Sequence, residues 1–462
     1  MIRIFRHYLS SAYIWLFVAE FIVLFFAMYY GTELRFFSST SWYTDEYIML
    51  SSFVFSVVTT ASNVGIGLYR RNLSWDDYYL ITRIAISFLV ALVFLIIIYY
   101  SFPEFVIARS VLVYSFILAF LGILICRYVF YTYIKQSSLK KRILIIGAGK
   151  NAKKLIGKDG NYIHVGYEVC ACVNINNAEI AVENQKVVTD EQTIYSIAEE
   201  LDIDEIVLAL DDRRCQFPMD DLLDCKVAGI DVVDLLTFYE RERSMIDLEN
   251  IYPSWFVFSD GFANGGMKVF GKRAVDLLAS SLLLLVSWPF MLMVVVAIYF
   301  ESRFKGPILY RQTRVGELDR NFDVLKFRSM RTDAELNGAQ WAKENDNRVT
   351  RVGGVIRKLR LDELPQIWNV FRGDMSFVGP RPERPVFVDE FDKTIPYYRK
   401  RHRVKPGITG WAQLCYPYGA NEYDARQKLQ YDLYYVKNYS LFLDVTIIIH
   451  TMEIILWGKG AR

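Results

Sequence analysis

The sequence is poor in the residues that build disulfide frameworks and zinc sites. Its 462 residues include six cysteines and four histidines, with no C-x-x-C pair and no histidine spacing typical of zinc ligands. Cys126 lies inside an apolar run, while Cys170 and Cys172 alternate along an expected strand. We therefore expect neither a disulfide-rich secreted protein nor a zinc enzyme, and we expect a reducing compartment for the soluble parts.

A cleavable signal peptide is also not evident. The first apolar run is long, and no small-residue cleavage site precedes its end. Hydrophobic residues make up 53% of the chain and aromatic residues 16%, which is high for a soluble enzyme. This composition predicts a membrane protein.

Four apolar runs approach or exceed the roughly 20 residues that cross the hydrocarbon core of a membrane. They cover residues 9–30, 47–68, 84–100 and 111–134. Basic residues gather before the first run, between the second and third, and at the end of the fourth: Arg3, Arg6, Arg70, Arg71, Arg83, Arg127, Lys135, Lys140, Lys141 and Arg142. The positive-inside rule then predicts a four-helix transmembrane bundle over residues 1–140, with both ends in the cytoplasm.

A fifth apolar run covers residues 274–300 and is long enough to span a membrane, yet both of its flanks are basic: Lys272, Arg273, Arg303 and Lys305. Pro289 lies in the middle of the run, where it removes one backbone hydrogen bond and clashes with the carbonyl of Leu285. We expect a kinked, re-entrant membrane helix that returns to the same face, with Ser287 as a partner for a freed carbonyl.

The last apolar stretch, residues 441–457, is interrupted by Asp444, His450 and Glu453. We expect a helix that packs on the domain or lies at the membrane interface, in preference to a further crossing.

Residues 141–240 predict a Rossmann-like α/β middle domain. A β-branched strand runs into Gly147-x-Gly149-x-x-Ala152 and then into a helical pattern, and further strands are expected at 167–174, 205–210 and 229–236. The glycines form a candidate nucleotide loop. However, the second strand ends near Asn174, where a dinucleotide site would place an acidic residue for the ribose. A structural or regulatory role is therefore favoured over dinucleotide binding, and residues 241–271 are expected to form a linker.

Positive charge is concentrated in the C-terminal part. Residues 301–410 hold 23 Lys and Arg against 15 Asp and Glu, so this stretch is +8 and the rest of the chain is −6. Such a field suits an anionic substrate or an anionic membrane surface, although an ordinary mixed surface stays an alternative.

Two adjacent carboxylates lie in this basic region, within "LRLDELPQIWN" (359–369). Pro365 places the start of a helix at about Asp362, and Gly373 is a typical helix end. We expect the helix N-terminus to lower the pKa of Asp362 and to attract phosphate. Adjacent Asp362 and Glu363 repel each other unless a cation such as Mg²⁺ neutralises them. Alone, the motif also fits a helix-capping Asp followed by a solvated Glu.

Several further motifs surround the pair: "GPILYRQTRVG" (306–316), "DVLKFRSM" (323–330), "RVTRVGGVIRKLRLDELPQIWNVFRGDMSFVGPRP" (348–382) and "RVKPGITGWAQL" (403–414). With these motifs the chain resembles the bacterial sugar transferases known as polyprenyl-phosphate hexose-1-phosphate transferases. It is most similar to their large form, which has four transmembrane helices and a Rossmann-like domain before the catalytic part. The resemblance covers roughly residues 268–457 and implies a monotopic α/β catalytic domain over 272–462.

The resemblance implies roles for individual residues. Asp362 is the expected nucleophile and Glu363 the expected ligand of Mg²⁺. Substrate phosphates are expected to bind Lys326, Arg357 and Arg381, and with weaker support Arg328, Arg351 and Gln366. Pro289 takes the position of the proline that breaks the re-entrant helix.

The implied reaction moves a hexose 1-phosphate from a UDP-sugar to undecaprenyl phosphate and releases UMP, through an aspartyl-phosphosugar intermediate. The implied place is the cytoplasmic face of a bacterial inner membrane, among membrane lipids, at the first membrane step of exopolysaccharide synthesis. One departure is "LCYPYGAN" (414–421), where the family has an Asn-Gly-Arg-like stretch, and this leaves the sugar or acceptor preference open.

Two other functions are alternatives. A membrane nucleotide-sugar dehydratase should carry Y-x-x-x-K, which does not occur after residue 141. An inactive scaffold for polysaccharide assembly is disfavoured by the intact carboxylate pair. A homodimer through the membrane or middle domain is compatible with the sequence, and no nucleic-acid partner is expected.

Overall fold

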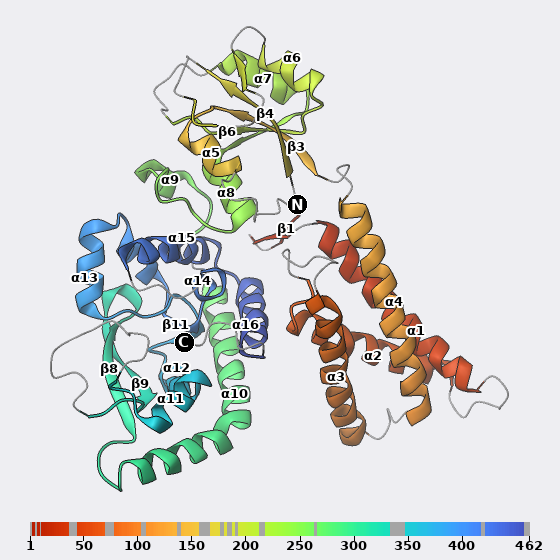
Figure 1. Cartoon of the computed structure of the whole chain (residues 1–462), viewed down its shortest axis with the longest axis vertical. Coiled ribbons are helices and arrows are strands. Elements are labelled where there is room, and N and C mark those ends of the chain that lie inside the picture. The colour runs from red at the N-terminus through yellow and green to blue at the C-terminus, as the bar shows by residue number, and fades with distance from the viewer. Residues whose placement is uncertain are drawn as a thin grey trace. The chain divides into compact units, whose positions relative to one another are not determined.

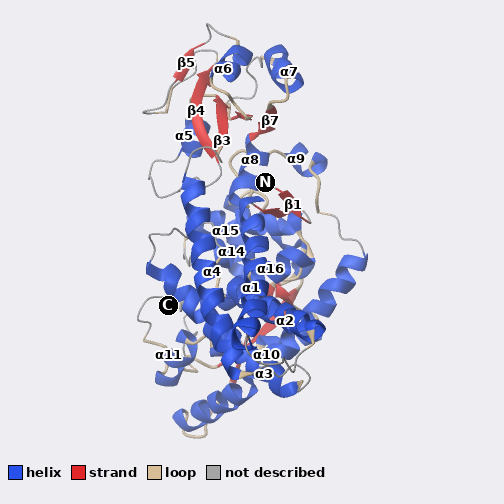
Figure 2. Ribbon diagram, turned by 90° about the vertical axis from the view of Figure 1, so that its right-hand side faces the viewer, coloured by secondary structure: helices blue, strands red, loops and turns tan. Residues whose placement is uncertain are grey.

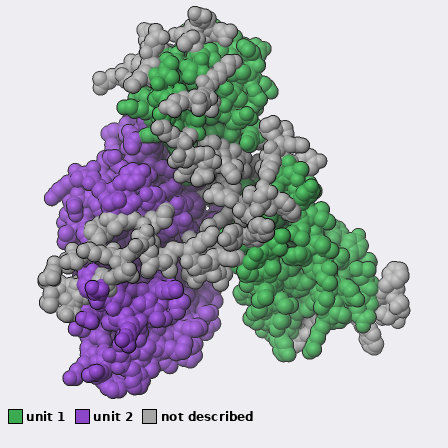
Figure 3. All heavy atoms as spheres, viewed as in Figure 1, with its two compact units in different colours: residues 1–2, 8–243 green, residues 3–7, 244–462 purple. Residues whose placement is uncertain are grey.

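The computed structural model describes most of the chain. The described residues are 2–4, 7–9, 11–36, 44–69, 78–102, 108–135, 140–156, 167–175, 180–182, 187–189, 193–211, 218–262, 266–332, 347–416 and 421–456. The chain forms two compact units (Figure 3), one of residues 1–2 and 8–243 and one of residues 3–7 and 244–462. The domain boundaries expected near residues 140, 240 and 271 stay predictions.

Four long apolar helices form the N-terminal part and confirm the four expected spans. They are α1 (Ser11–Phe36), α2 (Asp45–Gly65), α3 (Tyr78–Ser101) and α4 (Arg109–Lys135), preceded by the short strands β1 (Ile2–Ile4) and β2 (His7–Leu9). Each of the four helices is long and apolar enough to cross a membrane. Their shared core includes Leu24, Phe55, Phe88 and Ile123.

A buried ion pair lies inside this helical bundle. Arg127 Nε is 2.7 Å from Glu20 Oε1, and both side chains are fully buried. Tyr69 donates a hydrogen bond to Glu20 Oε2, and Arg127 donates one to the carbonyl of Leu68. Arg83 is also buried and donates to backbone carbonyls just after α2. Arg83 and Arg127 therefore form polar contacts inside the helical bundle. The positive-inside prediction of the orientation depends on the other basic residues.

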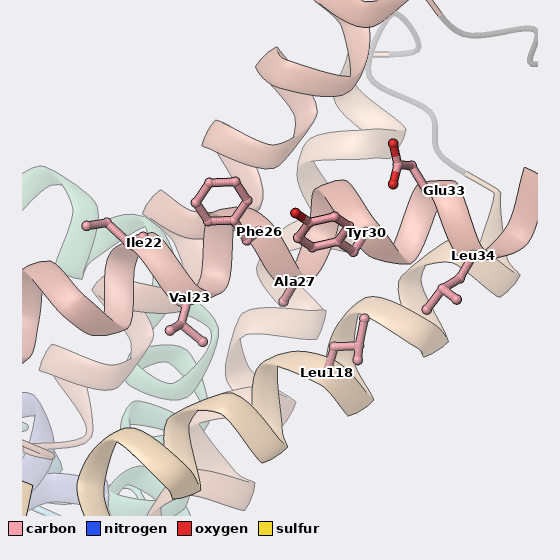
Figure 4. A pocket seen from close by; sticks show the side chains of 8 residues that line it. All are labelled: Ile22, Val23, Phe26, Ala27, Tyr30, Glu33, Leu34 and Leu118. Atoms are coloured by element: carbon pink, nitrogen blue, oxygen red, sulfur yellow. The ribbon is translucent and has the colours of Figure 1, made fainter. Parts of the chain in front are cut away.

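A mostly apolar groove opens on the surface of α1 and α4 (Figure 4). It is lined by Ile22, Val23, Phe26, Ala27, Tyr30, Glu33, Leu34 and Leu118. Such a lining is ordinary for helices that face lipid.

A parallel sheet of five strands forms the middle domain, as expected; Figure 2 shows its strands in red. The order is β5-β4-β3-β6-β7, from β3 (Lys141–Ile146), β4 (Tyr167–Asn174), β5 (Val187–Thr189), β6 (Glu205–Leu208) and β7 (Asp231–Asp234). The connecting helices are α5 (Lys150–Ile156), α6 (Ile194–Glu200), α7 (Met219–Val227) and α8 (Leu235–Arg243). The sequence did not predict β5, because three residues at a sheet edge are too few for a periodic pattern.

The second unit contains two small sheets among helices. An antiparallel hairpin joins β8 (Leu309–Val315) to β9 (Asn321–Phe327), and β10 (Ser376–Val378) lies parallel to β11 (Gly407–Thr409). The helices are α9 (Pro253–Phe258), α10 (Gly266–Glu301), α11 (Arg351–Lys358), α12 (Gln366–Arg372), α13 (Pro385–Thr394), α14 (Trp411–Cys415), α15 (Glu422–Asn438) and α16 (Leu441–Leu456). Short 3₁₀ turns lie at Glu317–Asp319, Leu361–Glu363 and Tyr398–Arg403.

Helix α10 contains the fifth apolar run, with Pro289 inside it, and Figure 1 shows that this helix is bent. The hydroxyl of Ser287 contacts Met291 Sδ at 3.8 Å, where we expected a bond to a freed carbonyl. A proline within a helix leaves one carbonyl without its usual donor, and a bend is the common result.

Both halves of α10 attach to the same domain. Before Pro289, Lys272 Nζ lies 2.8 Å from Asp444 Oδ2, and Arg273 donates to the carbonyls of Val370 and Phe371 at the end of α12. After Pro289, apolar side chains pack together in one cluster, which includes Val294, Ile298, Phe327 and Ile356. Lys272 and Arg273 therefore bind other parts of the same domain, whereas the sequence predicts that they are charges flanking a membrane segment.

The same contacts place the last helix. Asp444 lies in the first turn of α16, and its pairing with Lys272 fastens α16 to α10. The carboxylate also accepts a hydrogen bond from Tyr435 at 2.7 Å. Of the two expected arrangements for this segment, the structure has the helix that packs on the domain.

Candidate active site

The carboxylate pair lies in a tight turn directly before α12. Asp362 and Glu363 belong to the 3₁₀ turn Leu361–Glu363, and the α-helix begins at Gln366. Pro365 has no N–H to donate to the carbonyl of Leu361, so this first turn is closed by i to i+3 bonds in place of α-helical ones. The helix ends at Gly373, which has a φ of 89° and forms the expected left-handed cap.

An asparagine on α12 fixes this helix to the hairpin. The side-chain oxygen of Asn369 accepts a hydrogen bond from Leu325 N at 3.0 Å, and its amide nitrogen donates to Asp323 O at 2.8 Å. Both bonds are to backbone groups of β9, so the strand and the helix cannot slide past each other without losing them. Lys326, the next residue on β9, thereby reaches Glu363.

The loop after β10 positions Arg381, the second cation that contacts Glu363. Gly379 and Gly407 approach so closely that a Cβ at either position would overlap the backbone of the other strand's segment. This contact explains why glycine is needed both at position 379 and at position 407. Arg314 of β8 donates to the carbonyl of Pro382 and to Glu383, which holds the far side of the same loop. Arg381 lies between these two supports.

Glu363 is held by positive charge on several sides. Its Oε1 accepts from Arg381 at 2.7 Å and from Lys326 at 3.1 Å, and its Oε2 lies 4.0 Å from a guanidinium nitrogen of Arg360. Burial alone would raise the pKa of Glu363, but the charges of Arg381 and Lys326 outweigh burial and hold the pKa well below its usual range. This carboxylate is therefore ionised at neutral pH.

Asp362 has the opposite electrostatic environment. Burial first, and then the negative charge of Glu363, raise the pKa of Asp362 above its usual value, against the lowering effect of nearby cations. Lys326, Arg357 and Arg381 are those cations. The expectation that the helix N-terminus lowers this pKa is wrong, because desolvation and the neighbouring carboxylate have larger effects on a side chain that is 7% exposed.

The other expected phosphate-binding residues lie around this centre. Gln366 is buried at the start of α12, Arg351 is exposed at the start of α11, and Arg328 lies against Gly306. In the part of the chain that the structure describes, no hydrogen bond or ion pair joins these three side chains to the carboxylate pair. The site role of each expected residue stays a prediction.

The sequence did not indicate Arg360 as a partner of the pair. Arg360 has a φ of 59°, and this left-handed conformation turns the chain between α11 and the carboxylates. It is uncommon for a residue with a side chain, and it often marks a constrained site. No signal in the sequence pattern would have revealed it.

The residues present fit Mg²⁺ only with help from a substrate. Within the described residues, no cluster of three or more His, Cys, Asp or Glu gathers. Mg²⁺ in phosphate-transferring sites is often bound by one or two carboxylates together with substrate phosphates. Glu363 would be the residue to hold the ion, and in the described residues its Oε1 already accepts from Arg381 and Lys326.

Two parts of the chain match models of known protein families. Residues 267–458 match the model of the bacterial sugar transferase family, and residues 65–215 match a model described as a CoA-binding domain. A UDP-galactose-lipid carrier transferase of Erwinia amylovora is 31% identical over 70% of this chain and 69% of its own length. The chain belongs to the bacterial sugar transferase family.

Two further relatives are more similar to the chain over shorter stretches. A UDP-N-acetylgalactosamine-undecaprenyl-phosphate N-acetylgalactosaminephosphotransferase of Aeromonas hydrophila is 44% identical over 52% of the chain and 55% of its own length. An undecaprenyl-phosphate glucose phosphotransferase of Komagataeibacter xylinus is 44% identical over 41% of the chain and 36% of its own length. The match therefore spans about half, or less, of these two relatives.

The middle domain's candidate nucleotide loop does not fit coenzyme A or a dinucleotide. The amides of Lys150 and Asn151, which follow Gly147 and Gly149, donate to the carboxylate of Asp211 at 2.7 and 2.8 Å. In a nucleotide site these amides would bind the diphosphate. An internal carboxylate takes that place and would repel a phosphate. The structure thus favours the structural or regulatory role for this domain, with Ala152 buried in its core.

The opposite pKa shifts of Asp362 and Glu363 predict that removing each charge has a different effect on the stability of the fold. Because the folded-state pKa of Asp362 is raised, its ionisation at neutral pH opposes folding, and Asp362→Asn should leave the melting temperature equal or higher. The folded-state pKa of Glu363 is lowered, so its charge stabilises the fold above the unfolded pKa, and that contribution is lost as pH falls through the folded pKa. Glu363→Gln should therefore reduce the unfolding free energy by about 1–3 kcal/mol. Thermal melts at pH 7 in detergent measure both variants; a larger loss for Asp362→Asn would contradict this electrostatic description.

Proposed function

We propose that the protein is a phosphoglycosyl transferase that moves a hexose 1-phosphate from a UDP-sugar to undecaprenyl phosphate and releases UMP. The observation that carries this proposal is the buried carboxylate of Asp362 beside Glu363, whose charge is balanced by Lys326 and Arg381. The relatives named for glucose, galactose and N-acetylgalactosamine transfer to lipid carriers support the same reaction class. The product would start an exopolysaccharide or another surface glycan.

In the first step, a carboxylate oxygen of Asp362 attacks the phosphorus that bears the sugar. A new bond forms between that oxygen and phosphorus, and the bond from phosphorus to the UMP oxygen breaks. UMP leaves with the bonding electrons, and the hexose phosphate stays on Asp362 as an acyl phosphate. The raised pKa of Asp362 favours this role, because a more basic carboxylate is a better nucleophile once it is ionised.

In the second step, a phosphate oxygen of undecaprenyl phosphate attacks the same phosphorus. The bond to Asp362 breaks, the carboxylate is restored, and the lipid carries a diphosphate linked to the sugar. One displacement between two anions is thereby divided into two steps at one buried centre.

The cations would position and neutralise the phosphates. Phosphoryl transfer depends mainly on alignment and charge balance, and arginine is suited to bidentate phosphate contacts. Lys326, Arg357 and Arg381 act directly on the pKa of Asp362 and are the main candidates, with Arg328, Arg351 and Gln366 in outer positions. Bound Mg²⁺, held by Glu363 and the donor's phosphates, would supply further charge neutralisation.

We also propose a re-entrant path for α10, with the catalytic domain on the cytoplasmic face. A straight helix of 36 residues would be about 54 Å long. Yet side chains before and after Pro289 contact the same domain. A helix that crossed the bilayer would place those contacts on opposite sides. Return to one face keeps the site near the UDP-sugar and the lipid phosphate.

A surface on α11 and α12 supports an interfacial position. Val355, Leu359 and Trp368 are exposed, while Ile356 on the other side of α11 is buried. Arg351 and other basic residues accompany them, and exposed apolar groups beside cations are typical of helices that lie on anionic membranes.

The topology predicts which side of the membrane carries residue 305. A short tag inserted after Lys305 should be labelled from the cytoplasmic side of sealed vesicles, together with a tag at the C-terminus. A periplasmic tag inserted between α1 and α2 serves as the opposite control. Labelling of the Lys305 tag only from the periplasmic side would overturn the re-entrant path.

The reaction predicts UMP release from a UDP-sugar that depends on undecaprenyl phosphate and on Asp362. Asp362→Asn should abolish release, because an amide cannot form the acyl phosphate. A variant at the exposed Arg372 serves as a folded control. A panel of UDP-glucose, UDP-galactose and UDP-N-acetylgalactosamine with Mg²⁺ gives the measurement. No turnover with any donor would favour the scaffold alternative, and near-normal release by Asp362→Asn would exclude Asp362 as nucleophile.

The electrostatics predict the acidic limb of the pH profile. Asp362 must be ionised to attack, and its pKa is raised, so kcat/KM should begin to fall at a higher pH than an ordinary aspartate would give. Lys326 lowers that pKa, so Lys326→Met should shift the limb of the residual activity to still higher pH. Profiles of kcat/KM from pH 4 to 8 measure the shift. An unmoved limb, or one moved to lower pH, would contradict the assignment.

A further inference from the structure

The loop that carries Arg381, residues 378–383, is held through its backbone carbonyls. Neighbouring elements donate hydrogen bonds to the carbonyls of Val378 (from Lys272 of α10), Pro380 (from Gly407), Arg381 (from Arg401) and Pro382 (from Arg314 of β8). The two prolines of the loop have no N–H, so the loop has few donors of its own. Its path therefore depends on donors that other elements supply.

Arg401 is the buried arginine among these donors. It lies on the 3₁₀ turn that begins at Tyr398, and its side chain is 6% exposed, whereas that of Arg399 on the same turn is 38% exposed. The Nη2 atom of Arg401 lies 2.8 Å from Asp432 Oδ2 of α15 and donates to the carbonyl of Arg381 at 2.8 Å. The Nη1 atom donates to the Tyr398 hydroxyl at 2.7 Å. One guanidinium thereby joins its own turn, α15 and the loop that carries Arg381.

Stability alone does not account for the buried ion pair of Arg401 and Asp432. Removing a guanidinium and a carboxylate from water carries a large desolvation penalty, and well-packed apolar side chains of similar size are often at least as stabilising. An arginine differs from an apolar side chain in the hydrogen bonds that it donates. One of these bonds reaches the backbone of Arg381, a residue that contacts the carboxylate pair. This bond supplies a reason for a charge at this position.

The connection from Arg401 to the carboxylate pair runs through a single residue. Arg401 fixes the carbonyl of Arg381, and the guanidinium of Arg381 lies 2.7 Å from Glu363 Oε1. A hydrogen bond weakens steeply as its distance and angle depart from the optimum, so a displaced backbone at Arg381 would weaken its bond to Glu363. Among the described residues, the bonds of the Arg401 guanidinium go to the Arg381 carbonyl, to Asp432 and to Tyr398. Arg401 therefore acts on the pair through Arg381.

We infer that Arg401 is a positioning residue of the proposed reaction, which holds the backbone of Arg381 so that the Arg381 guanidinium stays on Glu363. Asp432 supports this role by balancing the buried charge of Arg401. As a part of catalysis the role rests on the transferase function proposed above, whereas the hold on Arg381 is a property of the fold.

The first test measures this coupling without turnover. Arg401→Lys keeps a positive charge beside Asp432, but lysine ends in one nitrogen and cannot take the places of Nη1 and Nη2 together. Arg381 should then hold Glu363 less well. The drop in melting temperature caused by Glu363→Gln should therefore be about half as large in Arg401→Lys protein as in the unsubstituted protein. Thermal melts of the full chain in detergent, with each change alone and with both, give the comparison.

Two controls separate positioning from general destabilisation. Tyr398→Phe removes another hydrogen bond of the same buried guanidinium, and Arg399→Lys makes the same exchange at the exposed position on the turn. In both backgrounds Glu363→Gln should cause its full drop. If Arg401→Lys does not fold, Arg401→Gln combined with Asp432→Asn leaves no unpaired buried charge and should show the same smaller drop. An undiminished drop with Arg401 replaced, or no drop in any background, would overturn the inference.

The second test uses UMP release. Arg401→Lys should lower kcat/KM about tenfold, because a small displacement of a group that positions substrate has a large effect on rate. In Arg381→Met protein the same exchange should lower the residual kcat/KM little further, since Arg401 acts through Arg381. A further tenfold loss in that background would make Arg401 a general structural residue and overturn the inference. The smaller drop in the melts, without UMP release by the unsubstituted protein, would contradict the transferase function and still support the hold on Arg381.

Discussion

The site depends on one interaction, the neutralisation of Glu363 by Arg381 and Lys326. Two adjacent carboxylates in a buried turn would otherwise repel each other, and both would tend to become protonated. By holding the charge of Glu363 in place, the two cations leave Asp362 as the carboxylate of the pair with the raised pKa. The remaining architecture serves to bring these cations together: Asn369 fastens the strand that carries Lys326, and the Gly379–Gly407 contact positions the loop that carries Arg381.

Under the proposed function, membrane attachment and catalysis would both depend on helix α10. Arg273, before the bend of α10, binds the carboxyl end of α12, and the half after the bend packs beneath β9 and α11. The carboxylate pair lies between these two attachments. A change in how α10 lies in the bilayer would therefore be transmitted to the turn at Asp362. In the proposed reaction, this coupling would give a physical reason for placing a phosphate-transferring site on a helix of this kind, since the proposed lipid acceptor has its phosphate at the membrane surface.

Much of the fold followed from the sequence, because long apolar runs and alternating strands produce strong periodic patterns. The resemblance gave Lys326 and Arg381 as phosphate-binding residues, but it did not predict that both pair with Glu363. Other features had no such pattern. Lys272 was expected as a flanking charge, but its partner Asp444 lies far away in the sequence. The raised pKa of Asp362 depends on burial, which a local motif does not reveal. The hydrogen bonds from the candidate nucleotide loop to Asp211 could also not be predicted without the structure, because they join segments about 60 residues apart.

In the proposed reaction, Asp362 carries the hexose phosphate during turnover. The most direct test incubates the protein with Mg²⁺ and a radiolabelled UDP-sugar in the absence of lipid acceptor, quenches the mixture, and locates the label by peptide mass spectrometry. The expected result is a hexose-phosphate adduct on Asp362 that disappears when undecaprenyl phosphate is added. Full turnover by a preparation in which the label never attaches to Asp362, or attaches to another residue, would contradict it.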